Sequence, residues 1–161
     1  MSVRSDFFSA QADTIRALVT GTAATDPDKI IVFHIDTETG HFGFVETTGG
    51  LDEWHRLTHC DLFDVTTRQI KGRDFTIFLD DLGLFKEGTI VSATDTTGAW
   101  QFVGSLVIAN RDNEGNTIGL TPNDMETILN RLKSVKVKRN GEERETAVLV
   151  LDELPPSKAE K

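Results

Sequence analysis

Two of the four histidines stand at a spacing that could hold a metal ion on a helix. His55 and His59 are four residues apart, Asp52 precedes them on the same flank, and Cys60 follows directly. Imidazole, carboxylate and thiolate groups suit zinc or another transition metal. Position 56 is Arg, where a metalloprotease-type helix would carry Glu. Solvated surface histidines are therefore the simpler interpretation, and a metal site is the alternative.

The other two histidines belong to an expected hairpin. His34 and His41 are diagonal neighbours across its strands, with Asp36 beside them on the face opposite the apolar residues. This set also offers ligands for zinc. We expect no cofactor, because a chain of 161 residues buries enough surface to fold without a metal. A metal- or small-ligand-binding protein, or an enzyme that uses these histidines, is the alternative.

Other chemical signatures are weak. Cys60 lies between His59 and Asp61, but adjacency in sequence is not the geometry of an activated thiol, so we expect a buried, inert cysteine. Residues 110–115 imitate the start of a calcium loop, yet Thr121 occupies its twelfth position, where a bidentate Glu is needed. The chain contains no GxxxxGK[ST], GxGxxG or GxSxG sequence. The sequence thus favours a non-enzymatic protein.

Most of the chain alternates between apolar and polar residues, which predicts strands paired as hairpins. The expected strand pairs are 30–36 with 41–47, 63–65 with 75–79, 89–95 with 100–109, and 135–139 with 145–151. The last pair flanks Asn140-Gly141, a strong hairpin signal. Gly104 interrupts its strand, where we expect another backbone to come close. Hairpins outnumber crossovers, so the fold class is α+β with a mainly antiparallel sheet.

Three helices are expected beside the sheet. Residues 5–19 carry an apolar stripe at near-helical spacing, formed by Phe8, Ala12, Ile15 and Leu18. A short middle helix covers residues 50–58, and a third lies near 121–133, where Thr121 is the N-cap and Pro122 the first helical residue. The domain boundaries follow from this order. We expect an N-terminal helix and linker at 1–29, a single α+β domain at 30–151, and a disordered tail at 152–161.

Three short stretches carry a family resemblance: Gly50-Leu51 with its helix, residues 75–84, and residues 103–121. Their order and spacing resemble an uncharacterised domain family carried by phages, plasmids and conjugative elements of Gram-positive bacteria. The resemblance covers roughly residues 30–133 and implies a genomic setting. It brings no known active site.

The charge is unevenly distributed along the chain. The total is −9, from 17 basic and 26 acidic residues. Residues 1–130 hold 9 basic and 20 acidic residues, a difference of −11, whereas residues 131–161 hold 8 and 6, or +2. The acidic body argues against direct binding to nucleic acid. No apolar run reaches the length of a membrane span, so we expect a protein of the bacterial host cytoplasm.

These observations favour an acidic binding protein from a phage or mobile element. Its partner would be a host protein with a basic groove, for instance a nucleic-acid-directed defence factor, and carboxylates would imitate phosphates. The residues selected for this surface are Asp52, Glu53, Asp80 and Asp81. A self-assembling accessory protein is a further alternative, in which the first helix or the Lys136–Lys138 strand joins copies into a homo-oligomer. Lysines on an edge strand otherwise protect it from such pairing.

Overall fold

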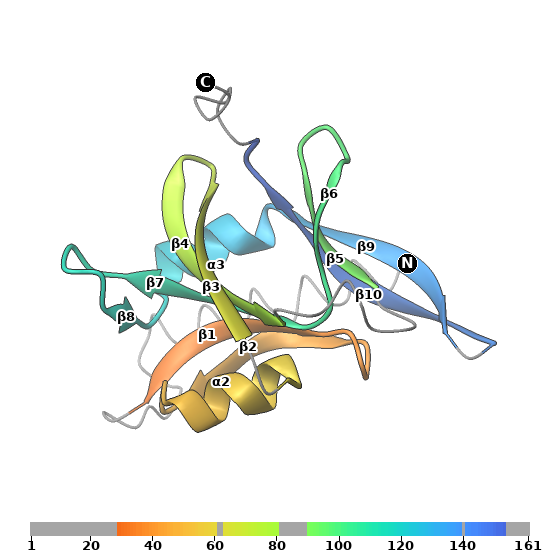
Figure 1. Ribbon diagram of the computed structural model, residues 1–161. Helices are drawn as coiled ribbons and strands as arrows, with labels where there is room; N and C mark the ends of the chain where they lie inside the picture. The colour runs from red at the N-terminus through yellow and green to blue at the C-terminus, as the bar shows by residue number, and fades with distance from the viewer. Residues whose placement is uncertain (1–28, 61–62, 81–89, 140, 154–161) are drawn as a thin grey trace, which may run out of the picture.

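Two β-sheets form the framework of the protein, as the computed structural model shows for residues 29–60, 63–80, 90–139 and 141–153 (Figure 1). The six-stranded sheet has the order β2-β1-β7-β4-β3, with β8 paired to β7. Its strands are β1 (Ile30–Asp36), β2 (His41–Thr47), β3 (Phe63–Ile70), β4 (Arg73–Asp80), β7 (Leu106–Arg111) and β8 (Thr117–Ile118). The four-stranded sheet has the order β6-β5-β10-β9. Its strands are β5 (Val91–Asp95), β6 (Trp100–Val103), β9 (Leu132–Arg139) and β10 (Glu142–Leu151).

The fold is α+β with mainly antiparallel pairing. All strand pairs are antiparallel in the described part of the chain except β5 with β10, which run parallel. The helices within the described ranges are α2 (Leu51–Thr58) and α3 (Pro122–Leu129). Neither has the length or the apolar stretch that crossing a bilayer requires. The helix predicted at 5–19 lies outside the described residues.

The chain changes sheet at Gly104. The expected long strand over 100–109 is instead two strands, because β6 ends at Val103 in one sheet and β7 begins at Leu106 in the other. Gly104 has φ +86° and donates its N–H to the Ile90 carbonyl at 2.9 Å. A Cβ added there would lie 3.9 Å from that of Asp80, which is ordinary contact. Glycine is thus needed for its positive φ, and not for the close backbone approach that we expected.

Both faces of the six-stranded sheet are covered. On one face, Phe33 and Ile108 join a core that also contains residues of the four-stranded sheet and of α3, such as Leu149 and Met125. On the other face, Trp54 of α2 packs on Phe78 with ring centroids 4.2 Å apart. The two helices therefore lie on opposite faces of this sheet, which has no solvated face along β1.

Helix α3 begins where its sequence predicts and ends early. Thr121 accepts the Asp124 N–H, and Asp124 accepts the Thr121 N–H, which completes a capping box. The helix ends at Leu129, and Leu132 is already the first residue of β9, paired with Leu149. The predicted end near 133 is wrong. Leu132 has helical spacing from Ile128, but it pairs with β10 as the first residue of β9.

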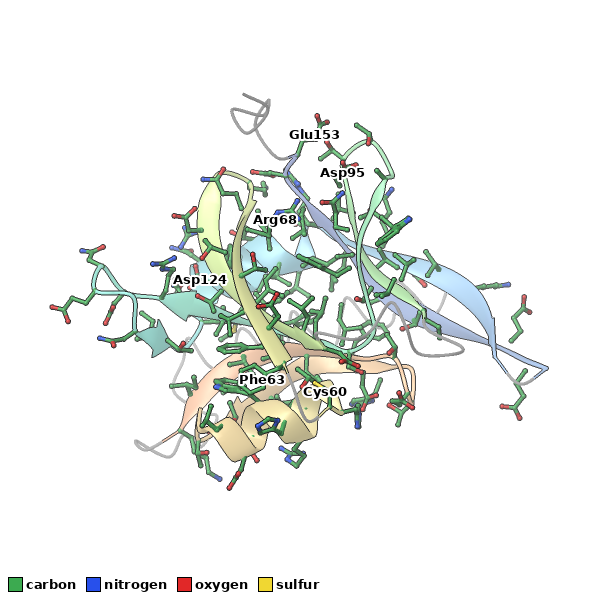
Figure 2. The ribbon with its side chains drawn as sticks, viewed as in Figure 1. Cys60, Phe63, Arg68, Asp95, Asp124 and Glu153 are labelled. Carbon is green, nitrogen blue, oxygen red and sulfur yellow. The ribbon has the colours of Figure 1, made fainter. Side chains whose placement is uncertain are left out.

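Buried polar contacts join the two sheets. The Arg68 guanidinium of β3 is buried, lies 5.6 Å from the centroid of the Phe102 ring, and donates to the Gln101 side chain at 2.9 Å (Figure 2). Asp152 accepts the backbone N–H groups of Lys71 and Gly72 at 2.9 and 2.7 Å, and so holds the β3–β4 turn. Asp152, the first residue of the predicted tail, is therefore part of the fold, whereas 154–161 lie outside the described residues.

Asp124 is the residue whose removal we expect to lower the free energy of unfolding most. Its carboxylate is 1% exposed and accepts bonds from Arg73 at 2.5 Å, Asn110 at 2.6 Å and the Thr121 N–H at 2.9 Å. Asp124→Ala should lower the free energy of unfolding by about 2–4 kcal/mol, because it removes a cap and leaves buried donors unpaired. Denaturant unfolding measures this loss. Glu126→Ala, on the exposed side of the same helix, is the matched control, and equal losses in the two variants would contradict the assignment.

Candidate functional site

Helix α2 presents two of the histidines away from its buried side. Trp54 and Leu57 are buried in the cluster beneath the helix, while Leu51 is exposed. His55 donates its Nδ1–H to the Cys60 carbonyl oxygen at 3.0 Å, and its ring forms an edge contact with the ring of Phe63. Because a carbonyl can only accept, this nitrogen carries the proton. This hydrogen bond joins His55 to the residues that follow the C-terminal end of its own helix.

His59 ends α2 and reaches the first hairpin. It adopts φ 58° at the C-cap, and its Nε2 lies 2.9 Å from Asp36 Oδ2. The other oxygen of Asp36 accepts the N–H groups of Glu38 and Thr39. Burial alone would raise the pKa of the Asp36 carboxyl, but the hydrogen bond and charge of His59 outweigh it and lower the pKa. The ionised carboxylate thus fixes the ring of His59.

His34 is buried, although the hairpin pattern placed it on the solvent side. The turn that ends α2 covers it, and its Nε2 donates to the Leu57 carbonyl at 2.8 Å. Burial lowers the pKa of His34, against the opposing effects of this hydrogen bond and of the Asp36 charge. His41, by contrast, is exposed at the start of β2. The interpretation of all four as solvated surface histidines is therefore wrong for His34.

The structure divides the predicted metal ligands among separate partners. His34 bonds Leu57, His55 bonds Cys60, and His59 bonds Asp36. Within the described ranges, no group of three or more His, Cys, Asp or Glu residues is placed to hold a metal ion. The Cys60 sulfur lies 3.1 Å from the Thr58 hydroxyl and is only partly buried. What the geometry does supply is one carboxylate-oriented imidazole, the Asp36–His59 pair.

Of the four carboxylates selected from the sequence, the three in the described part of the chain do not form one surface. Asp52 is exposed on α2, and its neighbour Glu53 bonds both Arg56 and Thr47. Those bonds, first of all the one from Arg56, lower the pKa of Glu53. Asp80 is buried at the end of β4, and Asp81 lies outside the described residues. Of the three that the structure describes, Asp52 is the exposed one.

A second acidic surface, which the sequence reasoning missed, lies at the β5–β6 turn. Asp95 ends β5 and Trp100 begins β6. Figure 2 shows Glu153 of the C-terminal segment near Asp95. The Thr96 hydroxyl donates to Glu153 at 2.6 Å, so the segment after β10 is tied to this turn. Trp100 is 53% exposed. We call the group of Asp95, Trp100 and Glu153 the turn surface.

A β-bulge turns Trp100 outward. Simple alternation places Trp100 and Phe102 on one face. In the structure Ala93 pairs with Phe102 and the next residue, Thr94, pairs with Trp100, so Gln101 is an extra residue in β6. Phe102 consequently faces the core while Trp100 faces away from it. The turn signal at Thr97-Gly98 was visible in the sequence, but the bulge was not.

Three of the four basic residues of β9 have acidic residues opposite them in the strand register. This strand is an edge of the four-stranded sheet, and the register pairs Lys136 with Glu145, Lys138 with Glu143, and Arg139 with Glu142. Opposite charges at paired positions stabilise a hairpin. The register of this hairpin therefore places positions of opposite charge across from each other at these three pairs.

Comparisons with protein-family models, with curated proteins and with solved structures find no match for this chain. The candidate sites therefore rest on the geometry of the described residues alone.

The burial of His34 predicts a stability that depends on pH. The pKa of His34 is lower in the native state than its ordinary value of 6.5, so the unfolded chain binds the proton more tightly. The contribution of neutral His34 to the free energy of unfolding is then fully present above about pH 6.5, and it is lost as the pH drops toward the lowered native pKa. Denaturant unfolding between pH 7.5 and about pH 5 should show this fall in the parent protein and a smaller one in His34→Gln. His41→Gln, at an exposed position, should behave like the parent, and the same pH dependence in all three proteins would contradict the prediction.

Proposed function

We propose that the protein is a non-enzymatic binding protein that recruits a basic partner protein through the turn surface. The observation that carries this proposal is Trp100, a large aromatic side chain that a β-bulge holds half-exposed at the start of β6, on the turn that begins at Asp95. Tryptophan is among the residue types enriched at the positions that dominate interface energies. An aromatic anchor on a turn that carries a carboxylate fits a partner with an apolar pocket bordered by Lys or Arg.

Hydrogen bonds hold the turn surface in one conformation. Asp95 Oδ1 accepts the N–H groups of Thr97 and Ala99 at 2.8 and 3.1 Å and also bonds the Thr97 hydroxyl. These bonds, led by that of the hydroxyl, lower the pKa of Asp95, so its carboxylate is ionised at neutral pH. A surface that is already ordered loses little entropy when a partner binds.

The negative net charge of the chain supports a partner with a basic surface. With a net charge of −9, the protein would be steered electrostatically toward a basic surface. Its own carboxylates would then occupy the positions that nucleic-acid phosphates take in the partner's groove. A host protein with a nucleic-acid groove, such as a defence factor, is the partner that we propose. The setting in a phage or other mobile element, in the bacterial cytoplasm, belongs to the same proposal and rests on the resemblance of residues 30–133.

Trp100→Ala tests the proposal. Immobilised parent protein should retain specific proteins from a bacterial lysate, and Trp100→Ala should lower their recovery about tenfold or more, as expected for the loss of a central aromatic anchor. Quantitative mass spectrometry of the eluates measures the recovery. Added duplex DNA should displace the same proteins if they present a nucleic-acid groove.

Val65→Ala is the matched control, because Val65 is also an exposed apolar residue on an edge strand, β3. It should leave the recovered proteins unchanged. Equal recovery with Trp100→Ala and Val65→Ala would refute binding through the turn surface. Recovery that resists DNA would refute the imitation of phosphates.

A further inference from the structure

Strand β10, in the interior of the four-stranded sheet, is buried even on the side that faces away from the core. Along β10, Ala147, Leu149 and Leu151 belong to the core cluster. The alternate residues Thr146, Val148 and Val150 point to the opposite side, which we call the outer face. They are nevertheless only 2%, 6% and 7% exposed, respectively. Residues this inaccessible need a layer of chain above them.

The described elements do not supply that layer. Val148 and Val150 belong to neither of the two described hydrophobic clusters. Helix α2 packs on the six-stranded sheet, and the buried residues of α3 lie in the core between the sheets. The Thr146 hydroxyl is buried and has no hydrogen-bond partner among the described residues, which indicates a dry, apolar cover. The cover must therefore come from another segment of the chain.

We propose that the outer face is the docking site of the N-terminal segment, with residues 5–19 lying across it as an amphipathic helix. A helix of this length spans about 22 Å, enough to cross the strands of a four-stranded sheet. Its stripe of Phe8, Ala12, Ile15 and Leu18 supplies the apolar side that the outer face needs. Residues 154–161 contain no comparable stripe.

The connection is long enough for this placement. Ten residues, 20–29, separate the helix from the start of β1, and an extended chain of that length reaches about 33–36 Å. Residues 81–89 also contain apolar side chains, but they join β4 to β5 directly. In sheet register Thr94 pairs with both Val150 and Trp100, so the docked helix would lie beside the turn surface. The docking does not depend on the proposed function.

Thiol labelling in the full chain tests the docking. Cys60→Ser removes the single native cysteine, and Val148→Cys then reports on the outer face. The new thiol should react with a disulfide reagent slowly, and Ile15→Asp should speed the reaction about tenfold or more by releasing the cover. Ala17→Asp introduces the same charge on the opposite side of the expected helix and should leave the rate unchanged. Val150→Cys replaces Val148→Cys if the latter does not fold.

Each other outcome overturns the proposal in a distinguishable way. A fast reaction without Ile15→Asp means that the outer face is open. A slow reaction that Ile15→Asp does not change assigns the cover to residues 81–89 or to another segment. Protection that disappears on dilution, together with a dimer mass in light scattering, assigns it to a second copy. None of these results depends on Trp100, so they leave the recruitment of a partner untouched.

Discussion

The positive φ of Gly104 is the constraint on which the two-sheet arrangement depends. It allows the chain to leave β6 at the edge of one sheet and to enter β7 at the centre of the other. As the central strand, β7 pairs with both β1 and β4, and Ile108 stands opposite Phe33 and Ile77. The core between the sheets therefore forms around a strand whose position is fixed by one glycine at a corner.

The same arrangement explains the environment of the histidines. Since the core takes one face of β1, helix α2 is left to cover the other, and it does so through Trp54 and Leu57. His34 then lies under the end of α2, close enough to bond the Leu57 carbonyl. The Asp36–His59 pair fastens the same helix end to the hairpin from outside. Residues whose types suggested metal binding thus attach α2 to its sheet.

Local sequence patterns predicted which segments form strands and helices. Long-range contacts determined which sheet each strand joins and which side chains are buried. The hairpins at Ile30–Thr47 and Phe63–Asp80 have the strand pairing expected from alternation and turn residues. The sequence could not reveal that Gly104 divides one expected strand between two sheets, because either partner sheet satisfies the same alternation. Nor could it show that Asp80 is buried or that Leu132 leaves its helix. The burial of His34 could not be predicted for the same reason, since it depends on which element covers the second face of the sheet.

The turn surface is coupled to the core through the bulge in β6. Gln101, the extra residue of that bulge, accepts a hydrogen bond from Arg68, and the Arg68 guanidinium also lies over the inward-facing ring of Phe102. A side chain of the six-stranded sheet therefore fixes the two residues that follow Trp100. Because Phe102 is held inward and Gln101 is held toward Arg68, Trp100 is directed to the opposite side. The exposure of Trp100 is thus a consequence of how the two sheets are joined, and a rigid fold keeps this side chain at the surface.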